Sequence, residues 1–230
     1  MKKEMWLILK HPETRRRYKI GNLNYNNKIY TFKYVNPELD DALKVGFKSF
    51  PGFEDINKIY TSDVLFANIE TRLPNVARKD YLEILNSYNL EQDSTKLEIL
   101  KATKGRLLKD NYEFVPAFDT SKVEFDVAGT RYCVDVNDCK KKINVNDKLL
   151  LELESDNKYD KYAIKVILKK DGEEYHLGYV PRYYSKELTD LLKNNIEYSA
   201  MIQSLNFESE INDEDITVLV KLIFNNKINR

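Results

Sequence analysis

From Lys122 onward, the chain consists mainly of short stretches in which apolar and polar residues alternate. Alternation with a period of two is typical of strands that bury one face. The stretches are VEFDVAG, TRYCVDV, DKLLLELE, YAIKVILKK, EEYHLGYV, EYSAMIQSLNF and DITVLVKLIF. Because six or seven short strands can share one core only by curving, the pattern predicts a small barrel or a strongly curved sheet. A single helix at 182–195, directly after Pro181, would cap it.

The first half of the chain mixes strand and helix patterns. Short strands are expected at 5–10, 16–21 and 28–35, followed by a brief helix with Asn36 as its cap, Pro37 in its first turn and Gly46 at its end. Apolar residues then recur at helical spacing as far as Gly105, and Asp93 or Ser94 is expected to cap the last helix. The pattern predicts an α+β domain at 1–118, with a mainly β, OB-like barrel domain at 119–230.

Composition limits the classes of function that the chain can have. With 230 residues, 42% of them hydrophobic, each of two domains can bury its own core. The 37 basic and 37 acidic residues cancel, so any contact with nucleic acid has to be a local site. No apolar run is long enough to span a membrane, and the short apolar stretch near the start is too quickly followed by charge for a secretion signal. We therefore expect a cytoplasmic protein without a membrane contact.

The sequence lacks the residue patterns of common catalytic and metal sites. Cys133 and Cys139 are the only cysteines, and with two histidines they are too few and wrongly spaced for structural zinc. Neither G-x-x-x-x-G-K-[ST] nor G-x-G-x-x-G is present, and no D…E-x-K spacing on paired strands suggests a metal-dependent nuclease. We expect a protein that is not an enzyme and that needs no metal or cofactor.

Three segments of the second half combine turn residues with aromatic and basic side chains. They are VAGTRY at 127–132, LELESDNKYDKYAIKV at 151–166 and LGYVPR at 177–182. Asn157 and Asp160 are ordinary turn residues, because their short side chains can satisfy nearby backbone groups, but turn chemistry gives no reason for Tyr159 between them. Taken singly, these tyrosines could be rings at the edge of a core, and the arginines could be ordinary surface charges.

In this order, and followed by a helix, the three segments resemble the HIRAN domain family over residues 123 to about 205. The family pattern has a Gly with a basic and an aromatic residue near the first strand, then NPYDxNAI, then GxVPR. Here Lys158 replaces the proline and Tyr162 replaces the asparagine of the second motif. The resemblance implies a small barrel that recognises DNA, in some relatives the 3′ end of a single strand.

The same resemblance implies roles for individual side chains. Arg131 would contact phosphate, and Tyr132 and Tyr159 would stack on bases. Asp160 would accept a hydrogen bond from the terminal hydroxyl, which distinguishes a strand end from a continuous strand. The expected nucleic-acid-binding residues are Arg131, Tyr132, Asn157, Tyr159, Asp160, Tyr179 and Arg182. DNA and RNA both carry a 3′ hydroxyl, so both remain candidate ligands.

Two features of the first half give further expectations. The segments YTFKYV, GFKSFPGF and SDVLFANIETRLPNVARKDY, within 28–85, are similar to the N-terminal subdomain of HipA-type kinases, which implies a protein partner for this domain. Arg15, Arg16 and Arg17 are candidate secondary phosphate contacts, or else a solvated hairpin turn. The alternative to DNA binding is therefore a protein-interaction module that docks such a kinase or a DNA-repair enzyme.

Overall fold

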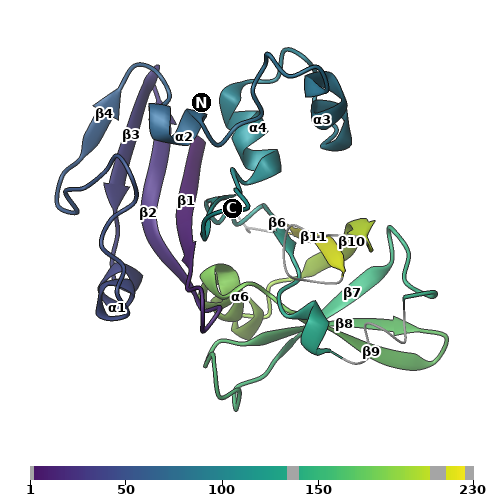
Figure 1. Ribbon diagram of the computed structural model, residues 1–230. Coiled ribbons are helices and arrows are strands. Elements are labelled where there is room, and N and C mark those ends of the chain that lie inside the picture. Colours follow the sequence, from purple (N-terminus) through teal and green to yellow (C-terminus); the bar gives the residue numbers. More distant parts are fainter. Residues whose placement is uncertain (1–2, 134–139, 208–215, 226–230) are drawn as a thin grey trace, which may run out of the picture. The chain divides into compact units, whose positions relative to one another are not determined.

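The computed structural model describes residues 3–133, 140–207 and 216–225 and is mainly β, with two antiparallel sheets and few helices (Figure 1). The chain divides into two compact units, Met1–Ala117 and Phe118–Arg230, called unit 1 and unit 2 below. The predicted fold class, an α+β domain followed by a mainly β small barrel with one helix, is confirmed. Within the described residues, no helix combines the length and the hydropathy that a membrane span requires.

Unit 1 is built on a five-stranded antiparallel sheet with the order β4-β3-β2-β1-β5. Its strands are β1 (Lys3–Lys10), β2 (Arg17–Asn26), β3 (Ile29–Tyr34), β4 (Tyr60–Ser62) and β5 (Tyr112–Pro116). Strand β5 lies just before the expected domain boundary at residue 118. It pairs along β1, with Leu7 opposite Phe114. Five residues are too few to show a clear alternation of apolar and polar side chains. The strand forms because β1, which is distant in sequence, satisfies its backbone hydrogen-bonding groups.

The helices of unit 1 are α1 (Glu38–Lys44), α2 (Ala67–Glu70), α3 (Tyr81–Ser87) and α4 (Lys96–Thr103). Residues of α1, α2 and α4 join the core formed by one face of the sheet, which contains stacked aromatic rings such as Phe32 and Phe53. Two expected caps were wrong. Pro37, not Asn36, is the N-cap of α1, and it forms no side-chain cap. Thr95 caps α4 in a reciprocal capping box with Glu98.

Unit 2 is a six-stranded antiparallel sheet with the order β6-β11-β10-β7-β8-β9. Its strands are β6 (Lys122–Asp126), β7 (Lys148–Leu153), β8 (Ile164–Lys170), β9 (Glu173–Tyr179), β10 (Tyr198–Asn206) and β11 (Thr217–Phe224), and its helix is α6 (Arg182–Lys193). The backbone N–H of Ala128, just after β6, donates to Tyr179 O at 2.8 Å, and the reverse bond is 2.9 Å. This bridge joins the two outermost strands, so the sheet closes into a barrel.

The segment TRYCVDV does not form the strand that we expected at its start. Thr130–Tyr132 form a short 3₁₀ helix, η1, which begins after Gly129 with φ of +76°. A glycine adopts this left-handed conformation without the strain that a Cβ would add. Residues 134–139, including Cys139, lie outside the described residues. The local alternation of apolar and polar residues is therefore no guide to the backbone at 130–132, where the chain turns at the surface.

Gly178 allows the barrel to close. It lies at an irregularity of the β8–β9 pairing and has φ of +139°. A Cβ at this position would lie 2.6 Å from Ala128 O and 2.6 Å from Val127 Cγ1. Since the first of these atoms belongs to the backbone, a larger residue would force the bridging segment away from β9.

We therefore expect Gly178→Ala to lower the free energy of unfolding of unit 2 by about 2–4 kcal/mol, because backbone strain and the steric clash add. Gly172→Ala is the matched control, since Gly172 also has a positive φ, of +80°, but open space around it, so its cost is limited to strain of about 1–2 kcal/mol. Thermal unfolding followed by far-ultraviolet circular dichroism measures both. Equal losses for the two variants would contradict a role of Gly178 in closure.

Candidate nucleic-acid interface

The first segment of the candidate interface presents a tyrosine ring with a guanidinium group on it. Tyr132, the last residue of η1, is 69% exposed. The guanidinium carbon of Arg131 lies 4.7 Å from the centroid of its ring, and Arg131 Nη2 donates to Tyr132 Oη at 2.8 Å. A cation held over an aromatic face in this way is a weak but favourable contact. Both planar groups are surfaces on which a nucleobase can stack.

The second segment is the turn between β7 and β8, which Asn157 and Asp160 close. Asn157 Oδ1 accepts hydrogen bonds from the backbone N–H groups of Tyr159 at 2.9 Å and Asp160 at 3.0 Å. Asp160 Oδ1 accepts from the N–H of Tyr162 at 3.0 Å, and its Oδ2 accepts from Ser185 Oγ at 2.8 Å. Both side chains therefore stabilise the turn by hydrogen bonds to its backbone, and Asp160 also links the turn to helix α6.

Tyr159 projects from this turn without serving it. Its side chain is 88% exposed, the highest value among the large apolar or aromatic residues that are exposed in the described structure. Both backbone polar groups of Tyr159 are hydrogen-bonded. Its N–H donates to Asn157, and its carbonyl accepts from Arg182 Nη1 at 2.8 Å. The ring is thus presented to solvent on a fixed backbone. The side chain of Tyr159 therefore does not help to stabilise the turn, in contrast to those of Asn157 and Asp160.

Glu154, a residue that sequence reasoning missed, connects the turn to the end of β9. Its Oε2 accepts from Asn157 Nδ2 at 2.5 Å, and its Oε1 lies 3.0 Å from Nζ of Lys165, the cross-strand neighbour of Tyr179. The hydrogen bond from Asn157 and the charge of Lys165 lower the pKa of Glu154, against the effect of partial burial. Its carboxylate therefore remains ionised at neutral pH.

Tyr179 lies at the junction of all three segments. Its backbone bonds to Ala128, and Lys165 is its cross-strand neighbour in the β8–β9 pairing. Its ring meets the ring of His176 edge to face, with centroids 4.9 Å apart, and His176 Nδ1 lies 3.9 Å from Cys133 Sγ. Partial burial raises the pKa of the phenol, and the nearby Glu154 carboxylate raises it further. Tyr179 is therefore a neutral hydroxyl at physiological pH.

Together these contacts place the seven expected residues of unit 2 in one region of the barrel. Segment 127–132 meets segment 177–182 at the Ala128–Tyr179 bridge, and the turn at 154–163 reaches the same strand end through the ion pair of Glu154 with Lys165, which lies opposite Tyr179. Arg182, the first residue of helix α6, donates a hydrogen bond to the carbonyl of Tyr159 in the turn. Glu154 was visible as an acidic residue in the letters LELES, but its ion pair with Lys165 of β8 was not.

The three consecutive arginines belong to unit 1. Arg15 lies in the turn between β1 and β2 with φ of +61°. Arg16 Nη2 is 3.7 Å from Asp41 Oδ2, and Arg17 Nε is 3.2 Å from the buried carboxylate of Glu113. Arg17 therefore has a structural ion pair, and a phosphate contact by this run stays a prediction.

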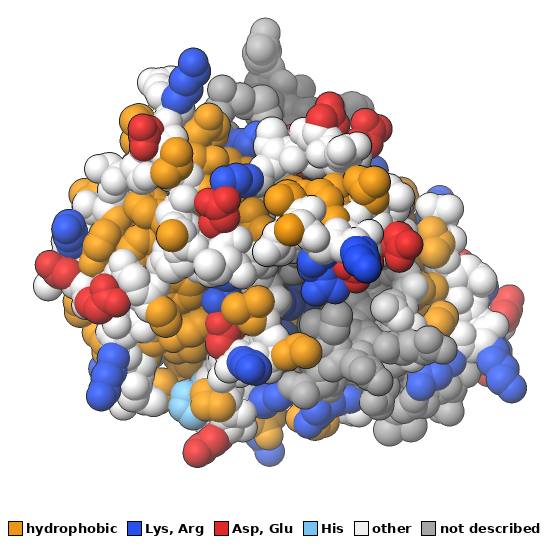
Figure 2. Space-filling view, turned by 45° about the horizontal axis from the view of Figure 1, so that its top comes forward, with side chains coloured by type: hydrophobic (Ala, Val, Ile, Leu, Met, Phe, Trp, Pro, Cys, Tyr) orange, Lys and Arg blue, Asp and Glu red, His pale blue; other side chains and the backbone are white. Residues whose placement is uncertain are grey.

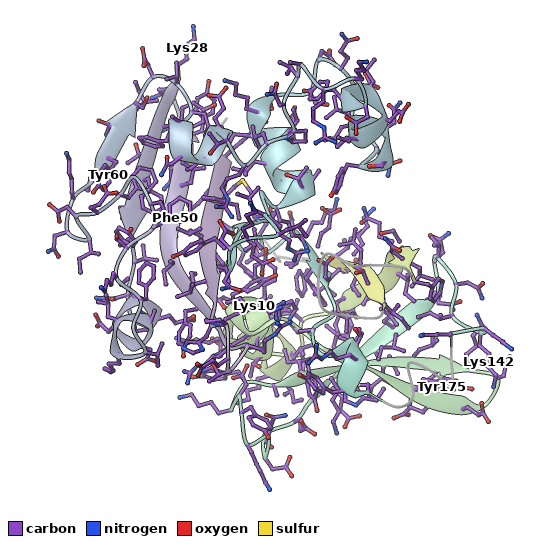
Figure 3. All side chains as sticks on the ribbon, in the orientation of Figure 1. Lys10, Lys28, Phe50, Tyr60, Lys142 and Tyr175 are labelled. Carbon is purple, nitrogen blue, oxygen red and sulfur yellow. The ribbon has the colours of Figure 1, made fainter. Side chains whose placement is uncertain are left out.

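A second polar cluster in unit 2 lies at the opposite end of β9 and has a structural explanation. Lys142 Nζ is 2.6 Å from Tyr175 Oη and 2.7 Å from Glu173 Oε2 (Figure 3). Lys170 Nζ lies 2.8 Å from Asp147 Oδ2 and donates to Lys142 O at 2.7 Å. These contacts tie the segment before β7 to the β8–β9 hairpin. Among the described residues, no group of three or more His, Cys, Asp or Glu side chains is arranged to hold a metal ion.

Charge on the face shown in Figure 2 is mixed, with basic and acidic side chains interspersed and hydrophobic side chains between them. This agrees with the formal net charge of zero. A ligand that carries many phosphates has no single-signed surface to follow there.

Comparison with known proteins finds a family match within unit 2. Residues 121–220 match the model of the HIRAN domain, so the resemblance expected for this segment is confirmed. The HIRAN domain of human HLTF shares 20% identity with the chain, with a TM-score of 0.34, over 46% of this chain and 75% of that one. A protein from Lactobacillus plantarum shares 25% identity, also with a TM-score of 0.34, over 45% of this chain and 92% of that one.

No curated protein matches the chain. The similarity of unit 1 to HipA-type kinases stays a prediction, because the family match covers residues of unit 2 alone.

Proposed function

We propose that the protein binds single-stranded DNA through its HIRAN domain, and that it recognises the free 3′ hydroxyl of a strand. The family match at residues 121–220 supports nucleic-acid binding by this unit. The observation that carries the proposal is the exposure of Tyr132 and Tyr159, at 69% and 88%, in segments that the barrel connects. Large rings exposed on ordered backbone are typical of stacking platforms for unpaired bases.

The proposed contacts are suited to a short stretch of strand rather than to a long one. Each ring accepts any base, since every base has a π face, and Arg131 and Arg182 supply positive charge beside the rings. Few basic groups mean few neutralised phosphates, and the affinity would then depend only moderately on salt. Binding would be insensitive to base sequence.

Recognition of an end follows from the acidic groups beside the rings. Asp160 accepts one protein hydrogen bond at each carboxylate oxygen and retains lone pairs at both. Glu154 stays ionised nearby. Carboxylates repel a phosphodiester but accept a hydrogen bond from a hydroxyl, so the region favours the one neutral donor that a strand end offers. The protein, on this proposal, binds and does not catalyse, and unit 1 provides a surface for a protein partner.

Fluorescence anisotropy with a labelled oligonucleotide tests this directly. A hydrogen bond to a charged group contributes about 1.5–3 kcal/mol, so a strand with a 3′ hydroxyl is expected to bind about 10- to 150-fold more tightly than the same strand with a 3′ phosphate. A circular single strand of equal composition, which has no end, is the control. Equal affinity for all three would exclude end recognition, and no affinity for any would exclude DNA binding and favour the protein-interaction alternative.

A further inference from the structure

One face of helix α6 carries three side chains that donate hydrogen bonds to the turn between β7 and β8. They are Arg182, Ser185 and Thr189, and their spacing of three and four residues places them along one side of a helix. Arg182 Nη1 donates to Tyr159 O at 2.8 Å. Thr189 Oγ1 donates to Tyr162 O at 3.2 Å. These two contacts hold the backbone of the turn on either side of residue 160.

Ser185 differs from the other two because it bonds to a side chain. Its Oγ donates to Asp160 Oδ2 at 2.8 Å, and the other carboxylate oxygen, Oδ1, accepts from the backbone N–H of Tyr162 at 3.0 Å. The last torsion of an aspartate side chain is broad, so a hydrogen bond at one oxygen alone does not fix the plane of the carboxylate. Donors at both oxygens do fix it. Ser185 thus determines how Asp160 directs its remaining lone pairs.

Burial makes Ser185 a support and not a ligand contact. The residue is only 1% exposed, so a nucleic acid cannot reach its hydroxyl. Ser185 Oγ also lies 2.9 Å from Arg182 O, an acceptor in its own helix, which is an ordinary local partner for a serine. The bond to Asp160 joins residues 25 positions apart. It is therefore the contact that local helix chemistry does not explain.

We propose that Ser185 is a positioning residue for end recognition, and that its buried hydroxyl orients the Asp160 carboxylate to accept the 3′ hydroxyl of a strand. The inference rests on the proposed function and deepens it, because it names the residue that determines how well a hydroxyl is distinguished from a phosphate. An acceptor that is already oriented loses less conformational freedom on binding. With alanine at position 185, Asp160 is held at one oxygen only, and its carboxylate can rotate away from the ligand.

The test compares the full chain with its Ser185→Ala variant in anisotropy titrations of two single strands, one with a 3′ hydroxyl and one with a 3′ phosphate. The preference for the hydroxyl, measured as the ratio of the two dissociation constants, is expected to fall about three- to tenfold, the net contribution of one hydrogen bond. The loss should come from weaker binding of the hydroxyl strand. In an Asp160→Ala background the same change should not alter the ratio, because both variants act through one carboxylate.

Thr189→Val is the matched control. Thr189 is 2% exposed and lies on the same face of α6, but its hydroxyl binds the backbone carbonyl of Tyr162 and not Asp160. Valine keeps the shape of threonine and removes the hydroxyl. This variant is therefore expected to lower the unfolding temperature, as Ser185→Ala does, because each leaves a turn acceptor without its donor. The ratio of the dissociation constants should stay at the wild-type value in Thr189→Val alone.

Three results would overturn the inference while leaving the proposed function intact. The first is a wild-type preference for the hydroxyl that Ser185→Ala retains. The second is a loss of affinity by the same factor for both strands, and the third is an equal fall of the ratio in Thr189→Val, since both indicate only a loosened turn. If Ser185→Ala does not fold, Ser185→Cys, whose thiol is a weaker donor of similar shape, gives the ratio instead. A wild-type protein without any preference would overturn end recognition and this inference together.

Discussion

Replacing Tyr132 and Tyr159 together by alanine is expected to weaken binding of a short single strand by about 2–6 kcal/mol, which is roughly 30-fold or more. Each ring that stacks on a base contributes about 1–3 kcal/mol, and the two rings lie in different segments of the barrel. Since the side chains are 69% and 88% exposed, their removal costs the fold little. Anisotropy titrations of the single and double variants would measure the loss.

The control for this experiment is Tyr88→Ala. Tyr88 is an exposed tyrosine of unit 1, outside the proposed interface, so the same change there should leave affinity unaltered. Thermal unfolding of all variants should coincide with that of the wild type. An unaltered affinity in the double variant would contradict stacking by these rings, whereas a lowered unfolding temperature would indicate that the rings support the barrel.

Replacing Arg72 by leucine is expected to destabilise unit 1 by about 3–5 kcal/mol. The Arg72 side chain is only 4% exposed, and its guanidinium forms two parallel bonds to Asp110, at 2.6 and 2.7 Å. It also donates to Gly105 O at 2.7 Å and to Tyr112 O at 3.2 Å. Leucine would leave a partly buried carboxylate and two carbonyl groups without their donor, which costs more than the ion pair itself contributes.

Arg78→Leu is a matched control for Arg72→Leu. Arg78 forms a similar paired contact with Asp80, at 2.9 and 2.7 Å, but its side chain is 55% exposed. Its removal should cost far less stability than the removal of Arg72, because water replaces the lost contact. Trp6 is the only tryptophan and lies in β1, so its fluorescence in a urea titration reports on unit 1. Equal losses for the two variants would show that burial is not the cause.

The sequence predicted the elements that local chemistry determines. Alternation of apolar and polar residues predicted most strands of the barrel, because side chains in a strand repeat every two residues and this period is visible in the sequence. The turn at 157–160 was predictable for a similar reason, since Asn157 bonds to backbone groups only two and three residues away. The cap of α4 was missed by one or two residues, because Asp93, Ser94 and Thr95 are all suitable caps and only the reciprocal bond with Glu98 selects one.

The sequence was a poorer guide where a residue depends on a distant partner. Strand β5 has too few residues for a pattern and is defined by its pairing with β1. The three residues 130–132 alternate like a strand but turn at the surface as η1. Lys165 looked like one basic residue among many, and its relation to Glu154 follows from the register of three strands.

By itself, the sequence determined the types of side chain available to the candidate site and the turns that carry them, since both depend on neighbouring residues and on backbone geometry. The tertiary structure decided which of those side chains meet. The contact of Asp160 with Ser185 spans 25 positions, and the Ala128–Tyr179 bridge and the Glu154–Lys165 ion pair also join segments that are apart in sequence. Such contacts arise from strand register and barrel closure, and these are set by burial of the whole core rather than by any short stretch of the chain.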